Sequence, residues 1–499
     1  MRYRLLLIGL MLSLAVQAWD WWPLPMAETD TTSQDSLRYE VIVSATAGSG
    51  RYNAFWMQSG QRGLASSAPY SGSLRAMIEK PATQPHRWFD YDGAVDIQLT
   101  VHSALPTPAN IRSKSAFPVF QGEQGSVIIH RLYAHVRLYI VDVSAGVMPM
   151  TDGMDVPLGS GSLLFSSNAP SMPAVRIGLD RWTPFPGLYG YLELKGGMAH
   201  AWLTDNIGVT GSMLHYKWIG AQVGGKLPVN ISYEFHHAAQ WGGYALDGTN
   251  LGNDWYSFRR MFIGKSGGSS HNELYNAIGN HVGSQQLALT LKGNKWNTKI
   301  YWQNFLEDNI ALLGKGKNLP DGRWGICAQQ QVWPFIHTLT FEYVCTTDQS
   351  GPVHDQDGII YAGNDNYYRN SIYQQGWNYY LRSLGTPLIT SPLYNGPTDG
   401  TQTTNNRIQA WHVGLGGDIY GYRYSLLATH IRNYGTYDLN DWFTQQSANT
   451  ALMLQVHKQV EKAWGMEFGV RLAADIGTQW GNCFSAQVTI RKQGLITQW

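Results

Sequence analysis

The chain has 499 residues, with 36 Lys plus Arg against 35 Asp plus Glu and a formal net charge of +1. This balance lacks the basic excess expected of a nucleic-acid-binding protein, and three cysteines are too few for a disulfide framework. Charged residues make up only 14%, whereas Gly (54), Tyr (28) and Trp (20) are abundant; ordinary soluble domains carry about 25% charged residues.

The first residues, MRYRLLLIGLMLSLAVQAWD, have the layout of a secretory signal peptide. A basic stretch with Arg2 and Arg4 precedes an apolar stretch, and small residues flank a cleavage site after Ala18. We therefore predict a signal peptide over 1–18 and an extended polar leader over 19–37. No later apolar run reaches the roughly 18 residues that a membrane-spanning helix needs.

An exported chain that is poor in charge, rich in aromatic residues and glycine, and without spanning helices is typical of an outer-membrane β-barrel. The predicted fold class is therefore all-β: a transmembrane antiparallel barrel in the outer membrane. Residues 38–499 show no break in composition and no fixed-period repeat, so we expect one barrel. Their length suits roughly 16 to 20 strands.

Four segments alternate between apolar and polar residues at the period of a β-strand. One face of WNTKIYWQNF (296–305) would carry Trp296, Thr298, Ile300 and Trp302, and the other Asn297, Lys299, Tyr301 and Gln303. Segments 337–345, 464–475 and 126–144 behave alike, although His130 interrupts the last one. Cys345 and Ile128 would lie on the outward, apolar faces of their segments, and Glu467 and Arg471 on the inward face of theirs. Alternation also fits a soluble sandwich, but tryptophans at both ends of one apolar stripe match the girdles of membrane barrels.

Two features near the chain's end and middle leave alternatives open. A terminal aromatic residue on an alternating last strand, such as Trp499, is typical of barrels inserted in the outer membrane. The alternation here is poor, because the polar residues Gln493 and Thr497 would lie on the same face as Trp499. Cys327 and Cys345 could form a disulfide or remain buried thiols.

The stretch LGSGSLLFSSNAPSMPAVRIGLDRW (158–182) contains glycines and serines that suggest chemistry, but the pattern is incomplete. Prolines follow the glycines and no Lys-Ser/Thr pair appears, so it is not a phosphate loop, and it lacks the GxSxG elbow of a serine nucleophile. His236 and His237 would point to opposite faces of a strand and could not easily share a metal. Nothing fixes Asp152, Asp155 and Asp180 at the separation that glycoside hydrolysis needs. We predict no enzyme activity, no metal and no cofactor.

Aromatic and arginine side chains gather between two probable strands near residues 240–260. Aromatic rings stack on sugars, and arginine forks pair with the carboxylates of acidic sugars. The candidate carbohydrate-binding residues are Trp241, Tyr244, Trp255, Tyr256, Arg259 and Arg260. Girdle aromatics and lumen-wall arginines are the alternative interpretation.

Several longer motifs occur in a consistent order along the chain. They include FWMQSGQRGL (55–64), LGSGSLLFSSNAPSMPAVRIGLDRWTPFPG (158–187) and LHYKWIGAQVGGKLPVNISYEFHHAAQWGG (214–243). In these motifs the sequence resembles the Wzi family of capsule assembly proteins, in its Bacteroides-type form, over roughly residues 38–499. The resemblance implies a barrel of about 18 strands that holds exported capsular polysaccharide at the cell surface, like a lectin and without covalent chemistry. Outer-membrane lipid and lipopolysaccharide would be its partners, and the outer-membrane export machinery could be another.

Enterobacterial members of that family look to have an N-terminal helical bundle that plugs the barrel, and the leader here shows no helical period. Inward-folded loops would then occlude the lumen, because irregular backbone at membrane depth needs protein or water around it. We expect the plug or constriction near 150–187. Its candidate residues are Gly159, Gly161, Pro170, Pro173, Arg176 and Asp180. An open lumen would indicate a porin or transporter instead, and an apolar lateral patch an accessory subunit of an export or assembly complex.

Overall fold

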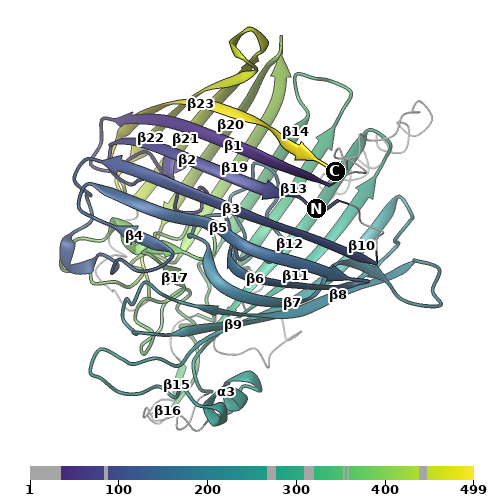
Figure 1. Cartoon of the computed structure of the whole chain (residues 1–499). Coiled ribbons are helices and arrows are strands. Elements are labelled where there is room, and N and C mark those ends of the chain that lie inside the picture. Colours follow the sequence, from purple (N-terminus) through teal and green to yellow (C-terminus); the bar gives the residue numbers. More distant parts are fainter. Residues whose placement is uncertain are drawn as a thin grey trace, which may run out of the picture.

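A computed structural model describes residues 35–83, 88–266, 277–307, 318, 320–351, 354–356, 359–437 and 447–499. The predicted signal peptide, 1–18, lies outside these residues. The chain forms a closed, all-antiparallel barrel of 18 strands (Figure 1), which confirms the predicted fold class. The first strand begins at Ser36, so the last two residues of the predicted leader, 19–37, belong to the barrel.

The barrel strands are β1 (Ser36–Gly48), β2 (Tyr70–Lys80), β3 (Phe89–His102), β5 (Gly125–Leu138), β6 (Val141–Met148), β7 (Met172–Pro184), β8 (Leu192–Trp202), β9 (Met213–Val223), β10 (Val229–Trp241), β11 (Asn280–Lys292), β12 (Trp296–Glu307), β13 (Gly322–Gln330), β14 (Thr338–Cys345), β19 (Ile408–Ile419), β20 (Tyr422–Asn433), β21 (Ser447–Val460), β22 (Met466–Gly477) and β23 (Cys483–Gln498). Shorter elements are β4 (Val119–Gln121), β15 (His354–Gln356), β16 (Ile359–Ala362), β17 (Asn378–Tyr379), β18 (Arg382–Ser383), the helices α2 (Phe55–Gln58) and α3 (Trp255–Phe262), and the 3-10 turns Ala109–Ile111, Pro392–Tyr394 and Glu461–Ala463.

Each barrel strand pairs with the strands before and after it in this order, and β1 pairs with β23 to close the ring. Closure leaves no sheet edge with unpaired backbone groups, as the hydrocarbon core of a membrane requires. Among the described residues, none of the helices is long and apolar enough to cross a bilayer.

The two ends of the barrel differ in the length of their connections. At one end the strands are joined by short turns, such as Tyr139-Ile140 and Tyr420-Gly421, and the start of β1 and the end of β23 lie there (Figure 1). At the other end long loops join the strands, the longest running from β14 to β19. We call these the short-turn end and the long-loop end. In bacterial outer-membrane barrels the short turns face the periplasm and the long loops face outside.

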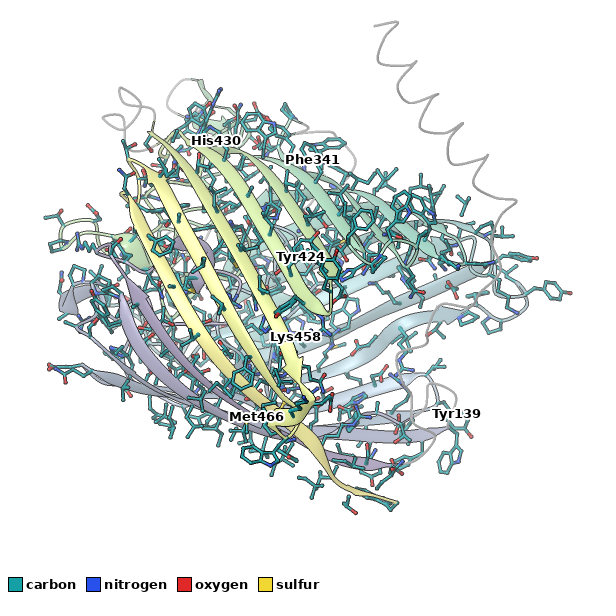
Figure 2. The ribbon with its side chains drawn as sticks, turned by 90° about the horizontal axis from the view of Figure 1, so that it is seen from above. Tyr139, Phe341, Tyr424, His430, Lys458 and Met466 are labelled. Atoms are coloured by element: carbon teal, nitrogen blue, oxygen red, sulfur yellow. The ribbon has the colours of Figure 1, made fainter. Side chains whose placement is uncertain are left out.

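Alternation along the strands separates a lipid-facing surface from the lumen, as predicted. On β12 the side chains of Trp296 and Ile300 are 44% and 43% exposed on the outside, whereas Tyr301 and Gln303 are buried inside. The predicted parities of β14 and β22 are confirmed for most residues; Phe341 of β14 is an outward-facing example (Figure 2). Cys345, predicted to face outward, is buried.

Aromatic side chains are exposed at nearly every turn of the short-turn end. They include Trp88, Tyr139, Tyr189, Trp333, Tyr420, Trp464 and Trp499. Such rings sit at the boundary between lipid tails and water in membrane proteins. This belt therefore marks one edge of the membrane-embedded surface.

The irregular parity noted in two segments arises from β-bulges. The predicted run 126–144 is two strands, β5 and β6, and the pairing of β5 with β3 skips His130. One extra residue reverses the parity, so Ile128 faces the interior, contrary to the prediction, while Leu132 faces outward. At the C-terminus the pairing of β23 with β1 skips Ile496, which resets the parity before Trp499.

The register of β13 and β14 settles the cysteine alternatives. Cys327 lies opposite Thr340 and Cys345 lies opposite Gly322, so the two thiols stand at separate levels of the sheet. All three cysteines of the chain are free.

Candidate functional site

Three inward segments, 49–69, 149–171 and 363–407, fold together inside the barrel, and we call them the plug. The Arg62 backbone N–H donates to the Ser167 carbonyl (2.7 Å), which links the first segment to the second. The Ser166 N–H donates to the Leu384 carbonyl (2.8 Å), which links the second to the third. The third is joined to the first by Arg382, whose Nη2 donates to the Ala65 carbonyl (2.8 Å). The plug is thus one cross-linked body.

The plug has an apolar core of its own. Trp377 is fully buried, its ring lies 5.4 Å from that of Phe165, and its indole N–H donates to the Leu164 carbonyl (2.7 Å). Phe165 in turn packs edge-on against Tyr216 of β9 (5.0 Å). Aromatic packing of this kind fixes the plug against the barrel wall in one orientation.

A buried charged cluster joins the second plug segment to β12, β13 and β14. The Glu342 carboxylate accepts hydrogen bonds from the Ser160 N–H (2.6 Å) and the Tyr301 hydroxyl (2.5 Å). Arg323 lies 3.6 Å from the same carboxylate and donates to the Met154 carbonyl (2.6 Å). Both charged side chains are inaccessible to solvent. The wall therefore supplies the hydrogen bonds that this irregular backbone would otherwise lack.

The first plug segment is held by a neighbouring part of the wall, β20 and β22. The Phe55 N–H, at the start of α2, donates to the Asp475 carboxylate of β22 (2.8 Å). The Trp56 indole donates to Thr429 of β20 (3.0 Å). The α2 residues are all buried in the lumen. Polar side chains of β13, β14 and β22 thus hold the plug by its backbone.

Of the segment 150–187, in which we expected the plug, residues up to 171 lie inside the barrel and residues Met172–Pro184 form strand β7. Gly159, Gly161 and Pro170 belong to the plug, and Gly161 has a φ of +93° that favours glycine. The barrel resumes with β7 at Met172. The strand pattern of β7, seen in Ala174, Val175, Arg176 and Ile177, is hard to recognise in the sequence because prolines and glycines surround it.

Pro173, Arg176 and Asp180 therefore lie in the barrel wall. Proline is tolerated near the first residue of a strand. Arg176 donates to the Asp180 carboxylate (2.7 Å) and its guanidinium covers the ring of Trp218 at 4.3 Å. This pair belongs to β7 and its neighbours rather than to the constriction.

Two carboxyl groups outside the strands are buried with few counter-charges. Burial raises the pKa of Asp155, in the plug, to about 6, and the neighbouring Asp152 carboxylate raises that pKa further. Burial raises the pKa of Asp205, in the loop from β8 to β9, to about 7. Asp205 accepts a hydrogen bond from the Tyr380 N–H of the plug (2.9 Å). Its protonation state is thereby coupled to a plug contact.

The predicted carbohydrate-binding residues lie at the long-loop end, on and beside α3 (Figure 1). Asp254 caps this helix by accepting from the Ser257 N–H (2.7 Å). Trp255 and Tyr256, in its first turn, are 69% and 51% exposed. Tyr244 and Arg259 are also exposed, and Arg260 covers the Tyr256 ring at 5.3 Å. We call Tyr244, Trp255, Tyr256, Arg259 and Arg260 the α3 surface.

Trp241 differs from the other predicted residues because only 4% of it is exposed. It ends β10 and packs against Phe258 of α3 (5.3 Å) and His200 of β8 (5.8 Å). Trp241 offers no ring face to a sugar and instead holds α3 on the barrel, which corrects its predicted role.

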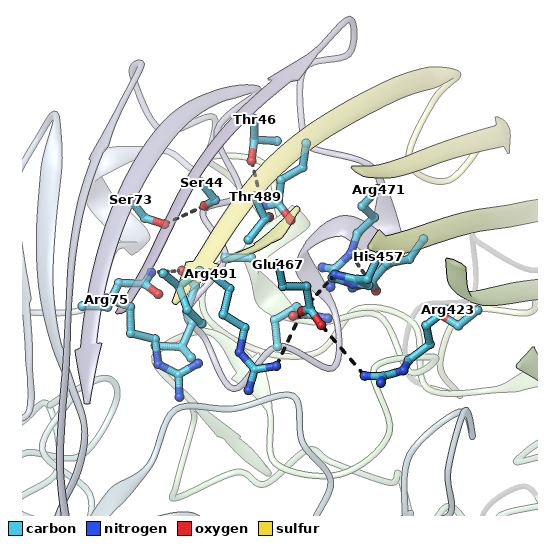
Figure 3. Close-up of a pocket in the computed structure, with 18 of the residues that line it drawn as sticks. Ser44, Thr46, Ser73, Arg75, Arg423, His457, Glu467, Arg471, Thr489 and Arg491 are labelled. Carbon is cyan, nitrogen blue, oxygen red and sulfur yellow. Dashed lines mark hydrogen bonds and ion pairs between the residues drawn. The ribbon is translucent and has the colours of Figure 1, made fainter. Parts of the chain in front are cut away.

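A cavity of about 580 Å³ that the sequence prediction did not identify lies in the lumen, between the plug and the short-turn end. Figure 3 shows Arg75, Arg423, Arg471 and Arg491 arranged around Glu467 in this cavity. Plug residues Leu64 and Leu158 form part of its wall. We call it the vestibule. The inward parity of Glu467 and Arg471 was visible in the sequence, but their neighbours come from strands distant in the chain. Among the described residues, no group of three or more His, Cys, Asp or Glu side chains could hold a metal ion.

A closed barrel with an apolar outside, an aromatic belt at its short-turn end and a polar lumen defines an outer-membrane type of β-barrel. No protein-family model and no curated protein matches this chain. Among solved structures it is similar to Wzi of Escherichia coli, an outer-membrane protein involved in group 1 capsule assembly and a carbohydrate-binding β-barrel. The identity is 12% and the TM-score 0.53, over 92% of this chain and 84% of that one.

The chain is also similar to two Pseudomonas aeruginosa proteins, OccK5 and OprD. Their identities are 8% and 12% and their TM-scores 0.45 and 0.44. The match covers 93% of this chain in both cases, with 99% of OccK5 and 96% of OprD. At these identities a likeness shows the fold alone.

Proposed function

We propose that this protein holds exported capsular polysaccharide at the outer surface of the outer membrane, without covalent chemistry. The observation that carries the proposal is the α3 surface: two exposed aromatic rings and an exposed arginine on a helix at the long-loop end. Outer-membrane lipid and lipopolysaccharide would surround the barrel. Wzi, which shares the fold, is described as a carbohydrate-binding barrel involved in capsule assembly.

The α3 surface suits a sugar polymer because its rings are held in place before any ligand arrives. Trp255 stacks on Phe258 at 5.3 Å and 21°, and Phe258 packs on the buried Trp241. A ring fixed in this way loses little conformational entropy on binding. Arg259 supplies an exposed donor for the carboxylate of an acidic sugar. A polymer that contacts many such surfaces is retained by multivalency even when each contact is weak.

The plug favours this proposal over a porin or transporter. Its three segments are hydrogen-bonded to each other and to the barrel wall, so a solute crossing the lumen would have to displace buried aromatic and charged groups. We expect the purified barrel to show no steady single-channel conductance in a planar bilayer. Large and steady openings would contradict the proposal of a polysaccharide anchor and would indicate a porin.

The direct test is retention of capsule by encapsulated cells that carry only a variant gene. We expect Trp255→Ala/Tyr256→Ala to shift polysaccharide from the cell pellet to the medium and to weaken its binding to the purified protein. Tyr189→Ala is the matched control, because Tyr189 is an exposed aromatic at the short-turn end. Equal retention and binding by the double variant and the control would contradict the assignment of the α3 surface.

A further inference from the structure

We infer that the vestibule is a second ligand site, one that binds an acidic saccharide, carboxylated or phosphorylated, presented from the short-turn end. This site lies at the opposite end of the barrel from the α3 surface and does not depend on the function proposed for that surface. The inference rests on the charges, the hydrogen-bonding capacity and the shape of the vestibule.

Positive charge exceeds negative charge on the vestibule wall. Its charged residues, apart from histidines, are Arg75, Arg423, Arg471, Arg491, Glu40 and Glu467. Two of the arginines have close carboxylate partners: Arg491 contacts Glu40 at 2.7 Å, and Arg75 contacts Asp96 at 2.6 Å. The other two do not.

Arg471 has no carboxylate within 4.0 Å among the described residues, and its recorded hydrogen bond is from Nε to the Gln455 side-chain oxygen (3.2 Å). Its terminal nitrogens are therefore open to a ligand in the vestibule. Arg423 lies 4.0 Å from Glu467 and 65% of its side chain is exposed. Glu467 is shared, since it also lies 3.6 Å from Arg491. A guanidinium has five N–H donors in a planar fork, which suits bidentate binding of a carboxylate or phosphate.

The remaining wall of the vestibule suits a sugar. Hydroxyl groups line the side formed by β1, β2, β3 and β23, namely Ser44, Thr46, Ser71, Ser73, Thr100 and Thr489. A sugar ring carries several hydroxyls that pair with such groups while its acidic substituent faces the arginines. The volume of about 580 Å³ falls within the range of small-molecule sites. The plug closes the side of the vestibule that faces the long-loop end, so a ligand would enter and leave at the short-turn end.

The test is calorimetric titration of the purified, folded full-length barrel in detergent with three probes: glucuronate, glucose 6-phosphate and glucose. We expect the two charged probes to bind in the millimolar range, more weakly at high salt, and glucose to bind at least tenfold more weakly. Arg471→Gln should lower the affinity for both charged probes about tenfold, in line with the loss of a charge-assisted hydrogen bond. The ratio of the two affinities then separates a carboxylate ligand from a phosphate ligand.

Two further variants keep the test decisive. Arg423→Gln, at an exposed position, should also weaken binding if Arg471→Gln fails to fold. Arg259→Gln, on the α3 surface, should leave binding of the charged probes unchanged. Equal binding of glucose and glucuronate, no binding of the charged probes to the wild type, or unchanged affinity in folded Arg471→Gln and Arg423→Gln would each overturn the inference. Unchanged capsule retention in Trp255→Ala/Tyr256→Ala, together with glucuronate binding that depends on Arg471, would contradict the proposed function but not this site.

Discussion

Replacing Glu342 by glutamine should loosen the plug without breaking the barrel. The substitution keeps the shape of the side chain and one of its two oxygen acceptors, so it can accept from Ser160 or from Tyr301 but not from both. It also removes the only negative charge that an ion pair gives to the buried Arg323 among the described residues. The guanidinium is left in the lumen with the Met154 carbonyl as its acceptor. Because Met154 belongs to the plug, the substitution weakens the contact between the plug and the barrel wall.

The size of the effect follows from the burial of both partners. Breaking a fully buried ion pair by removing one partner costs about 3–5 kcal/mol. Because glutamine still accepts at one oxygen, we expect the lower end, about 3 kcal/mol. A difference of this size raises the fraction of molecules with a displaced plug roughly 150-fold. Replacing both partners, as in Glu342→Gln/Arg323→Met, should recover most of that loss, since removing both sides of a buried pair is often nearly neutral.

Single-channel recording measures this fraction directly. The wild type should stay closed, Glu342→Gln should show brief openings, and the double variant should be mostly closed again. Glu79→Gln is the control: Glu79 is a lumen carboxylate that contacts Arg131 at 3.1 Å and takes no part in the plug contacts described above. If Glu342→Gln and Glu79→Gln opened equally often, the ion pair would not be what holds the plug.

Three other predictions concern the plug and its loops. Burial raises the pKa of Asp205 to about 7 from the usual 3.8, so the stability this carboxyl contributes is complete below the unfolded value and is lost as pH rises through about 7. Relative to the intrinsic exchange rate at each pH, the amides of residues 203–212 should be less protected from hydrogen exchange at about pH 8 than at about pH 5, and equally protected at both in Asp205→Asn. Trp377→Ala should destabilise the plug by about 3–5 kcal/mol because it empties a fully buried site, which a lowered urea midpoint for a fluorescent probe on the plug would report; an unchanged midpoint would mean that the aromatic core is not what holds it. Gly385→Ala would place a methyl group against the Tyr368 hydroxyl and the Leu163 carbonyl, so trypsin should cleave after Arg382 in the folded variant and not in the wild type.

Strand alternation made the barrel predictable from the sequence, because a lipid-facing residue and a lumen-facing residue must alternate wherever the wall is regular. The parity of Trp296, Ile300, Tyr301 and Gln303 could be read directly. It failed where a bulge added one residue: His130 reversed the face of Ile128, and no composition signal marks such a position. The signal was therefore strong in the regular strands and weak at their irregularities.

The candidate sites were less predictable, because their members are brought together by closure of the ring. The α3 residues could be found since they are close in sequence, yet burial of Trp241 depends on Phe258 and His200, which only the fold supplies. The plug boundary was misplaced because prolines and glycines around Met172 concealed the start of β7. Arg75 of β2 and Arg471 of β22 both line the vestibule. They are far apart in the chain, and no sequence motif near either residue indicates that the two side chains line the same cavity.

The pairing of β1 with β23 fixes an order of events during biogenesis. Ser36 lies opposite Gln498, so the ring cannot close until the final residues of the chain have been delivered to the membrane. Plug contacts also span much of the chain: Arg382 donates to the Gln58 carbonyl across 324 positions. Contacts between residues so distant in sequence form slowly. If the ring closed before they formed, segment 363–407 would be left outside the lumen of the barrel. A hydrogen-bonding edge of the nascent sheet must therefore stay unpaired until the interior is filled.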